Sequence, residues 1–297
     1  MKKPNKYLTK NLKSWNGFKI FTSNLSQNWI FRGQGDSSWE LKSSIERTNF
    51  IKLYEDIEQS FLIEFKRGAK NFLTEKEIPD NLIEWLALMQ HHGAPTRLLD
   101  FTKSALIAVF FAFENLFQSA KSVAIWGINE HILNLRLNEY LELRHDEKFE
   151  EARMKFSDED YDASRRKYTY KDFEDIFYLN SKSCIMPVEP FNMNKRYALQ
   201  QSIFISSGNS FDPLMDQLEF LGKDIEKTIV KICLPTTLQK EVLKDLQKMN
   251  ITRTTLFPDL DGFANGLKMK YNLILSPSDD AITQYQSYIK NKKRLYP

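Results

Sequence analysis

The stretch Gln90-His91-His92-Gly93-Ala94-Pro95-Thr96-Arg97-Leu98-Leu99-Asp100-Phe101-Thr102 carries the densest run of chemically useful side chains in this chain. Its glycine and proline end the helix that apolar spacing predicts over residues 82–90, because both residues break helical geometry. The polar residues beyond this break favour a functional site. They also have a structural alternative, since Asp100 and Thr102 are suited to cap a further helix predicted to run through Phe113.

His91 and His92 stand together at the end of the predicted helix and are two of the four histidines in the chain. Adjacent side chains on a helix point ~100° apart, so the pair is poorly placed to chelate one metal ion. We therefore predict no metal site, and we expect one of the histidines to hydrogen-bond a backbone or ligand group.

A second cluster, Phe31-Arg32-Gly33-Gln34, lies at the end of a buried strand predicted over residues 29–33. A buried arginine is costly unless it meets an anion or several acceptors, and its planar fork suits phosphate or carboxylate groups. The glycine allows a ligand or another backbone to approach closely. The alternative to ligand binding is an internal salt bridge from Arg32, for instance to Asp100.

The third cluster, Arg196-Tyr197-Ala198-Leu199-Gln200-Gln201-Ser202-Ile203-Phe204, brings paired glutamines to the start of a predicted strand. Glutamine amides donate and accept hydrogen bonds but transfer no protons near neutral pH. On a regular strand Ser202 and Phe204 share one face, which would line a cleft while the isoleucines fill the core. The alternative is a polar edge that leads into a core strand.

The remaining periodicity predicts an α+β protein. The further predicted elements are two strands and two amphipathic helices, over residues 121–128, 228–234, 53–73 and 238–248. Residues 130–182 are charged and weakly periodic, and we expect a helical insertion or a mobile flap there. We predict one domain over residues 1–297, with its core over residues 15–270.

Composition bounds the class of protein. The chain has 297 residues, of which 42% are hydrophobic and 27% are charged, as is ordinary for a globular protein. A net charge of +3 does not by itself indicate nucleic-acid binding, although a local basic groove is compatible with it. Aromatic residues reach 13% and supply stacking surfaces as well as core.

Several classes are disfavoured by what the sequence lacks. The two cysteines are far apart, and the longest apolar run is much shorter than the roughly 20 residues of a membrane-spanning helix. We therefore expect a cytoplasmic protein without membrane contact. The phosphate loop of nucleotidases, the dinucleotide-binding glycine motif, the serine-hydrolase elbow and the zinc-protease motif are all missing from the sequence.

Together the clusters resemble the FRG domain, a family named for its Phe/Tyr-Arg-Gly tripeptide. The matching pieces occur in the family's order: Phe31–Gln34, Ser44–Arg47, His91–Thr102, Arg196–Phe204 and Leu256–Gly262. The tripeptide alone is weak evidence, whereas the second histidine and the residues through Asp100 form a specific run. Two small departures are Phe101, where the family has Trp, and Ser202, where it has Gly.

The resemblance implies a function. FRG proteins are similar to ADP-ribosyltransferases, and some resemble toxins of phage-defence toxin–antitoxin systems that modify RNA. It implies an ADP-ribosyltransferase-like fold, a mixed or antiparallel sheet core with surrounding helices, and NAD as the substrate. In such transferases a strand-borne arginine followed by glycine helps to hold NAD, as Arg32-Gly33 would. The protein mainly binds the pyrophosphate, restrains the ribose and positions the acceptor.

The resemblance also assigns roles to residues. The expected catalytic residues are Arg32, His92, Thr96, Arg97, Asp100 and Gln201. The expected NAD-binding residues are Phe31, Arg32, Gly33, Gln34, His91, Thr102, Gln200 and Phe204. The expected partners are nucleic acid, chiefly RNA gripped by Arg165-Arg166-Lys167, and antitoxin and chaperone proteins that restrain the toxin.

One departure leaves the mechanism open. Many such transferases have a glutamate where Gln200 and Gln201 fall, so Glu46, Glu189 and Asp100 are the candidate carboxylates. Two other functions stay open as well. One is a non-catalytic module that senses a nucleotide or a phage component, and the other is a nuclease that uses His91 or His92 as general base with Asp100.

Overall fold

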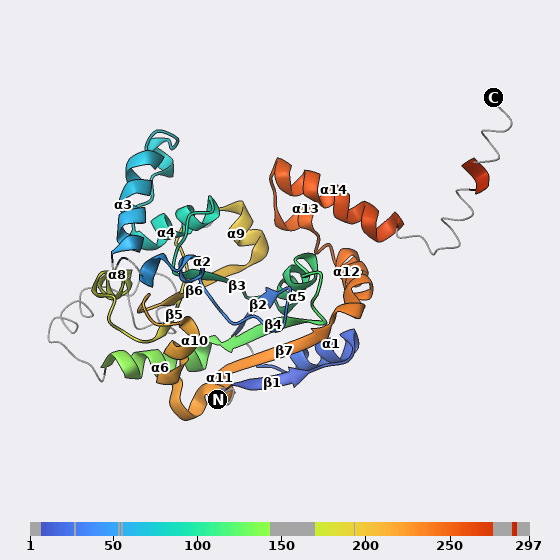
Figure 1. Ribbon diagram of the computed structural model, residues 1–297, viewed down its shortest axis with the longest axis horizontal. Helices are drawn as coiled ribbons and strands as arrows, with labels where there is room; N and C mark the ends of the chain where they lie inside the picture. The colour runs from blue at the N-terminus through green and yellow to red at the C-terminus, as the bar shows by residue number, and fades with distance from the viewer. Residues whose placement is uncertain are drawn as a thin grey trace. The chain divides into compact units, whose positions relative to one another are not determined.

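The computed structural model describes residues 7–26, 28–52, 54, 56–142, 170–192, 194–275 and 287–289 (Figure 1). The chain divides into two compact units, Met1–Leu238 and Gln239–Pro297. The first unit contains the three sequence clusters described above, and the family-like run at residues 256–262 lies in the second unit. Among the described residues, no helix combines the length and the apolar character that crossing a membrane requires.

A seven-stranded sheet forms the centre of the first unit, in the order β1-β7-β4-β2-β3-β6-β5. The strands are β1 (Leu8–Asn11), β2 (Trp29–Gln34), β3 (Leu98–Thr102), β4 (Ser122–Asn129), β5 (Ile185–Val188), β6 (Ser202–Ser207) and β7 (Ile229–Pro235). β1 runs parallel to β7, and the other neighbouring pairs are antiparallel. The predicted α+β class with a mixed sheet is therefore confirmed.

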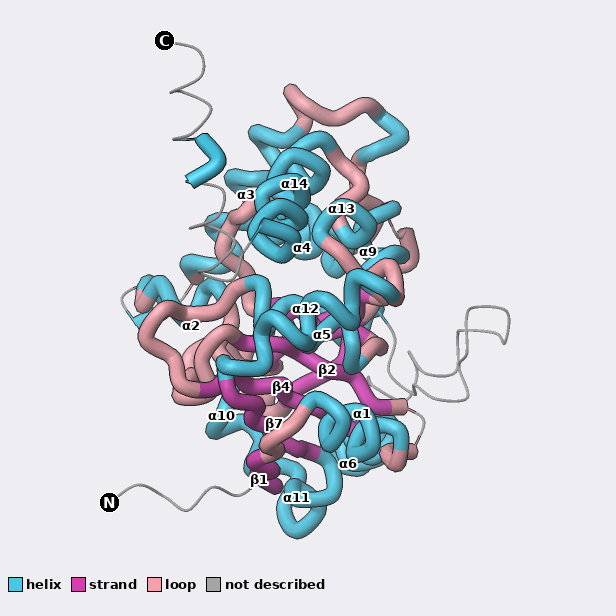
Figure 2. The backbone as a smooth tube through the Cα atoms, turned by 90° about the vertical axis from the view of Figure 1, so that its right-hand side faces the viewer, coloured by secondary structure: helices cyan, strands magenta, loops and turns pink. Residues whose placement is uncertain are grey.

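Helices cover both faces of the sheet (Figures 1 and 2). In the first unit they are α1 (Trp15–Ser23), α2 (Ser44–Thr48), α3 (Ile57–Ala69), α4 (Leu82–His91), α5 (Ala105–Glu114), α6 (Glu130–Glu142), α8 (Tyr170–Leu179), α9 (Lys195–Gln200), α10 (Leu214–Gln217) and α11 (Ile225–Thr228). Short 3-10 turns occupy Phe50–Lys52, Glu75–Glu77, Leu218–Asp224 and Thr236–Leu238. Helices α4 and α5 lie on one face, and α10 and α11 lie on the other.

Alternate residues of the strands pack into two hydrophobic cores, one on each face of the sheet. Leu98 of β3 and Phe204 of β6 pack in the core with α3, α4 and α8. Leu99 and Phe101, on the same β3 strand, pack with β6 isoleucines and with α10 and α11 in the second core. Because successive strand residues point to opposite faces, β3 contributes buried side chains to both cores, and Asp100 is its exposed residue.

The second unit consists of α12 (Gln239–Lys248), α13 (Arg253–Leu256) and α14 (Leu260–Leu275). The amphipathic helix predicted over residues 238–248 is confirmed by α12. Helix α14 approaches α13 closely, since a Cβ added at Gly266 would lie 2.2 Å from the hydroxyl oxygen of Thr254.

The predicted strands over residues 29–33, 121–128, 202–206 and 228–234 are confirmed by β2, β4, β6 and β7. The structural alternative for Asp100 and Thr102, as caps of the next helix, does not hold. Both residues lie on strand β3, and Ser104 caps α5 by accepting a hydrogen bond from Ile107 N. Thr102 supports this cap indirectly, because its hydroxyl oxygen accepts from Ser104 N at 3.1 Å.

The helical character predicted for residues 130–182 is found at the two ends of that stretch, in α6 and α8. Both helices belong to the cores: α6 buries Leu133 and Leu137, and α8 buries Phe173 and Phe177. Arg165-Arg166-Lys167 lies outside the described residues. The end helices therefore pack as parts of the first unit, because their apolar faces complete its cores.

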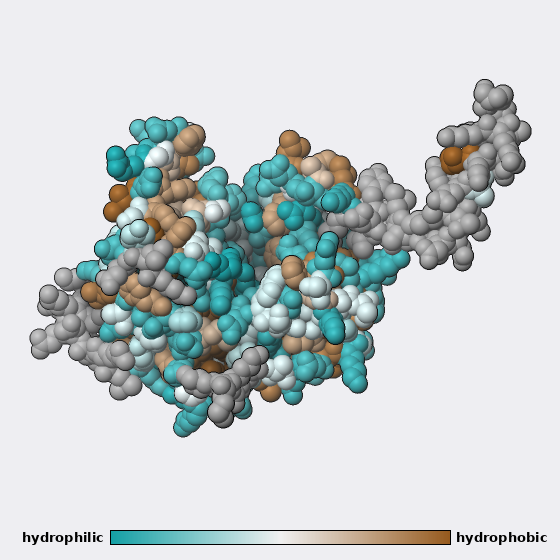
Figure 3. Space-filling model, viewed as in Figure 1, coloured by the Kyte–Doolittle hydropathy of each residue, from teal (hydrophilic) through white to brown (hydrophobic). Residues whose placement is uncertain are grey.

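The helix predicted over residues 53–73 is confirmed by α3, which is shorter than predicted and covers Ile57–Ala69. Leu62 and Glu58 are buried on one side of α3. Ile63 on the helix, and Phe72 just beyond its end, are exposed. Figure 3 shows the resulting apolar patches over α3.

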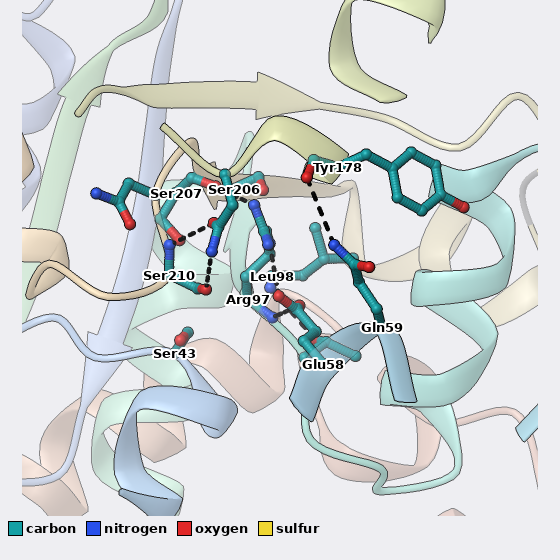
Figure 4. Close-up of polar contacts among 12 residues, drawn as sticks. Ser43, Glu58, Gln59, Arg97, Leu98, Tyr178, Ser206, Ser207 and Ser210 are labelled. Carbon is teal, nitrogen blue, oxygen red and sulfur yellow. Dashed lines mark hydrogen bonds and ion pairs between the residues drawn. The ribbon is translucent and has the colours of Figure 1, made fainter. Parts of the chain in front are cut away.

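A buried ion pair fixes α3 to the sheet. Arg97, 1% exposed, donates from Nε to Glu58 Oε2 at 2.7 Å, and its backbone N–H donates to Glu58 Oε1 at 2.8 Å (Figure 4). Its guanidinium also donates to the Ser207 carbonyl at 3.4 Å and lies 4.2 Å from the centre of the Phe177 ring. One side chain thus joins α3, β3, β6 and α8.

We expect Glu58→Gln to lower the free energy of unfolding by roughly 3–5 kcal/mol, because it leaves the Arg97 charge buried without its counterion. The Glu58→Leu/Arg97→Met double variant should regain much of this loss. Chemical denaturation measures both effects, with Glu64→Gln on the exposed side of α3 as the matched control. Equal stability of the Glu58 and Glu64 variants would contradict the assignment.

Candidate functional site

The three sequence clusters lie on three neighbouring strands, β2, β3 and β6. Asp100 pairs with Phe204, and Thr102 pairs with Ser202, in the β3–β6 ladder. The sheet therefore brings the three clusters onto adjacent strands.

Strands β2 and β3 separate on one side of a single residue pair, Phe31 with Thr102. Arg32 reaches across the separation and donates from Nη1 to the backbone carbonyl of Asp100 at 2.7 Å. The same nitrogen lies 3.7 Å from Asp100 Oδ2. The Arg32 side chain is 18% exposed and that of Asp100 is 64% exposed, so this ion pair borders solvent on the aspartate side.

The hydrogen-bonding capacity of Arg32 is only partly used. Its Nε is buried and has no hydrogen-bond partner among the described residues. Burial lowers the pKa of the Arg32 guanidinium, Asp100 opposes this shift, and the like charge of Arg47 adds to it. Arginine nevertheless stays protonated at neutral pH, so a charged fork with an unused donor lies at the gap between the strands.

A relay of hydrogen bonds orients Asp100 from the side of α4. Gln90 Nε2 donates to Asp100 Oδ1 at 2.6 Å, and Gln90 Oε1 accepts from the Thr96 hydroxyl at 2.7 Å. The relay continues to α2, because Thr96 N donates to the Ser44 hydroxyl oxygen at 2.9 Å. The amide of Gln90 fixes one carboxylate oxygen and leaves the other facing Arg32.

Sequence reasoning placed Ser44 and Arg47 in a family-like run and Gln90 at the start of the cluster that precedes β3, but it gave none of them a role in the site. The signal that points to Gln90 is its place at the end of a helix directly before the break, where a long amide side chain can return to the following strand. Thr96, by contrast, is an expected catalytic residue that is fully buried. It contacts Asp100 only indirectly, through its hydrogen bond to Gln90.

The two histidines lie beside this network. Their rings are 5.0 Å apart at a right-angled orientation, and the His91 ring lies 6.3 Å from that of Tyr197. Neither histidine hydrogen-bonds Asp100, whose carboxylate is held by Gln90 and Arg32 in the described part of the chain. That part also contains no group of three or more side chains placed to hold a metal ion.

Tyr197 is a further neighbour of the site. Its hydroxyl donates to the Ala87 carbonyl at 2.8 Å, so it anchors α9 to α4. Burial, and secondly the charge of Asp100, raise the pKa of Tyr197 above its usual range. The phenol therefore stays protonated at neutral pH.

Several residues expected at the site lie in the core instead. Phe204 is 1% exposed and meets Tyr197 edge-on at 5.6 Å, so its predicted face does not line a cleft. Phe31 is likewise buried, and Arg97 is held by Glu58. The reason is that β3 and β6 have helices on both faces, which fill both sides with side chains.

Gln34 has a structural role in β2. Its Oε1 accepts from the Trp126 indole at 2.7 Å, and its Nε2 donates to the Glu40 carbonyl at 3.1 Å. These two bonds hold β2 to β4 and to the loop that follows β2.

The glutamine pair lies at the far end of β3. The Thr102 hydroxyl donates to the Gln200 carbonyl at 2.7 Å, and the Lys103 N–H donates to the Gln201 carbonyl at 2.9 Å. Gln201 is exposed and has φ 48° and ψ 47°, a left-handed conformation that costs a non-glycine residue of the order of 1 kcal/mol. Close by, Glu189 pairs with Lys103 at 2.6 Å.

The sequence left open whether Gly33 admits a ligand or another part of the backbone, and in the structure its close neighbour is backbone. A Cβ added there would lie 1.9 Å from the Ala108 carbonyl oxygen and 2.7 Å from the Ala112 nitrogen, both in α5. The glycine therefore admits the backbone of α5, which packs directly on β2.

We expect Gly33→Ala to lower the free energy of unfolding by roughly 3 kcal/mol, because the new methyl group displaces α5. Gly68 in α3 offers the matched control, since nothing lies within 4 Å of an added Cβ. Gly68→Ala should instead raise stability by up to about 1 kcal/mol through its helix propensity. Urea denaturation of the two variants measures both changes in the free energy of unfolding. A Gly33→Ala protein as stable as the parent would contradict the close packing of α5 on Gly33.

Comparison with known proteins supports the family. No curated protein and no solved structure matches the chain. Residues 27–121 match the FRG domain. This stretch includes β2, the relay from Ser44 to Asp100, and helices α3, α4 and α5. Over residues 27–121 the chain is an FRG domain, which confirms the family predicted from its motifs.

Proposed function

We propose that this protein is an NAD-dependent ADP-ribosyltransferase that modifies nucleic acid, chiefly RNA, as the toxin of a phage-defence toxin–antitoxin system. The observation that carries the proposal is the charged fork of Arg32, which has an unused buried donor beside the oriented carboxylate of Asp100. A cation and a carboxylate in this arrangement suit a diphosphate and an electron-poor ribose. The FRG domain and its similarity to such transferases supply the reaction class.

In the proposed reaction the bond between ribose C1′ and the nicotinamide nitrogen breaks, and nicotinamide leaves with the bonding electrons. The acceptor nucleophile forms a new bond to C1′ and releases its proton, which Asp100 accepts. Arg32 holds the pyrophosphate of NAD. Asp100 also stabilises the positive charge that develops on the ribose, because a carboxylate favours an oxocarbenium-like transition state.

Asp100 suits this role better than the two glutamates. Glu189 is neutralised by Lys103 at 2.6 Å. Glu46 accepts from Leu214 N at 3.4 Å, and burial raises the pKa of its carboxyl group. Asp100 combines exposure with two fixed neighbours, Gln90 and Arg32.

A non-catalytic module that binds a nucleotide is the second candidate. The burial of Phe31 and Phe204 favours it, since neither ring is exposed to stack on nicotinamide. The nuclease alternative has less support, because Asp100 is held by Gln90 and not by a histidine. The toxin proposal also includes antitoxin and chaperone partners, and a cytoplasmic site of action.

The test is incubation of the purified full chain with NAD labelled in its adenosine part and with separate RNA, DNA and protein pools. We expect label on RNA, with loss of transfer in Arg32→Ala because the diphosphate loses its charged anchor. Asp100→Asn should reduce transfer by about 10²-fold while NAD still binds. The matched controls, Arg67→Ala in α3 and Asp216→Asn in α10, change exposed residues of the same types and should transfer normally.

The outcomes separate the candidates. NAD binding without transfer or released nicotinamide would favour the binding module, and strand cleavage without NAD would favour the nuclease. A folded Arg32→Ala protein that still transfers label at the normal rate would falsify the assignment of Arg32.

A further inference from the structure

The carboxylate of Asp100 lies closer to a neutral amide than to the neighbouring cation. Gln90 Nε2 donates to Asp100 Oδ1 at 2.6 Å, whereas Arg32 Nη1 is 3.7 Å from Asp100 Oδ2. Direct hydrogen bonds between a guanidinium and a carboxylate are about 2.7–2.9 Å long. The same Arg32 nitrogen reaches the backbone carbonyl of Asp100 at 2.7 Å, so the guanidinium is near enough to pair. The carboxylate is therefore held back from it.

Thr96 sets the direction in which the Gln90 amide points. The Thr96 hydroxyl oxygen accepts from Leu98 N at 3.3 Å, and its single proton is donated to Gln90 Oε1 at 2.7 Å. Because Thr96 occupies the oxygen of the amide, the amide nitrogen is the group that faces Asp100, and it can only donate. The bond from Gln90 thus requires an acceptor, which an ionised carboxylate provides.

Helix α2 fixes Thr96 in turn. The N–H of Thr96 donates to the Ser44 hydroxyl oxygen at 2.9 Å, and the Thr96 carbonyl accepts from the Ser44 hydroxyl at 3.0 Å and from Ile45 N at 3.1 Å. Thr96 is also fully buried. Both backbone polar groups of Thr96 are therefore held by α2, and the amide of Gln90 receives its orientation when the chain folds.

The restraint matters because the Asp100 side chain is 64% exposed and would otherwise be free to turn onto Arg32. A guanidinium and a carboxylate in direct contact satisfy each other's charge and hydrogen bonds. Neither group would then be available to a ligand. With the carboxylate held by Gln90, Arg32 keeps a buried Nε that has no partner among the described residues.

We propose that Gln90 is a positioning residue that holds the Asp100 carboxylate off Arg32, and that Thr96 sets the direction of the Gln90 amide. The site then keeps a cation and a carboxylate side by side without letting them neutralise each other. The reaction that Asp100 serves rests on the proposed function. The separation of the two charges rests only on the hydrogen bonds of Gln90 and Thr96.

The test is a double-mutant cycle, which measures the interaction between Arg32 and Asp100 without requiring turnover. Arg32→Met and Asp100→Asn are made singly and together, both in the parent chain and in Gln90→Met, and the unfolding midpoints are compared. We expect the non-additive part of the midpoint shift to be larger in Gln90→Met, because the released carboxylate contacts Arg32. Gln118→Met, at an exposed glutamine, is the matched control background and should leave this coupling unchanged.

Thr96 supplies a second pair of variants. Thr96→Val keeps the shape of the side chain but loses the hydroxyl, so the Gln90 amide is free to turn over and the coupling should rise as in Gln90→Met. Thr96→Ser keeps the hydroxyl and should retain the parent coupling. A purely structural role of these residues predicts lower unfolding midpoints in Gln90→Met and Thr96→Val with an unchanged coupling between Arg32 and Asp100. That result would overturn the positioning role.

Calorimetric titration of the full chain with inorganic pyrophosphate gives a second readout. Gln90→Met should weaken binding about tenfold, because Asp100 then competes for Arg32. Adding Asp100→Asn to Gln90→Met should restore binding, since the competing carboxylate is removed. Weakened binding that Asp100→Asn does not restore would count against the positioning role.

The two readouts also distinguish this inference from the proposed function. A raised coupling in Gln90→Met and Thr96→Val, with no label transfer by the parent protein, would support the role of Gln90 and overturn the transferase. Normal transfer by the parent protein together with an unchanged coupling would leave the transferase intact and overturn the role of Gln90.

Discussion

The ion pair between Arg97 and Glu58 is the interaction on which the arrangement of the FRG domain depends. Its two partners are far apart in the sequence, one in α3 and one at the start of β3. By bonding both the side chain and the backbone N–H of Arg97, Glu58 fixes where β3 begins. The position of β3 in turn sets the position of Asp100 three residues later, and so the geometry of the gap that Arg32 crosses.

Arg32 and Arg97 show how the same side chain serves two purposes. Arg97 has a carboxylate, a carbonyl and an aromatic ring around it, so its charge is met within the protein. Arg32 has one carbonyl and a more distant carboxylate, and its Nε has no described partner. The contrast gives Arg97 a structural role and leaves Arg32 with an unused donor, a distinction that residue type alone does not make.

The strands with strong apolar runs were predictable from the sequence, because burial imposes an apolar pattern that local reasoning detects. Strand β3 was not, since a helix break followed by Asp100 and Thr102 has the same local pattern as a helix cap. Its identity as a strand comes from pairing with β6, about a hundred residues later. The burial of Phe204 and the pairing of Arg97 with Glu58 were not predictable either. Both depend on helices that pack from elsewhere in the chain.

The contact between Gly33 and the backbone of α5 has a consequence for ligand recognition. A strand that packs directly on a helix backbone has little freedom to shift, so the backbone of Arg32, next to Gly33, is held in a fixed position. Part of the conformational entropy that an incoming anion would otherwise cost is lost already when the chain folds. Adaptation to different ligands then falls to the opposite side of the gap, where the Asp100 carboxylate is exposed and is held through side chains.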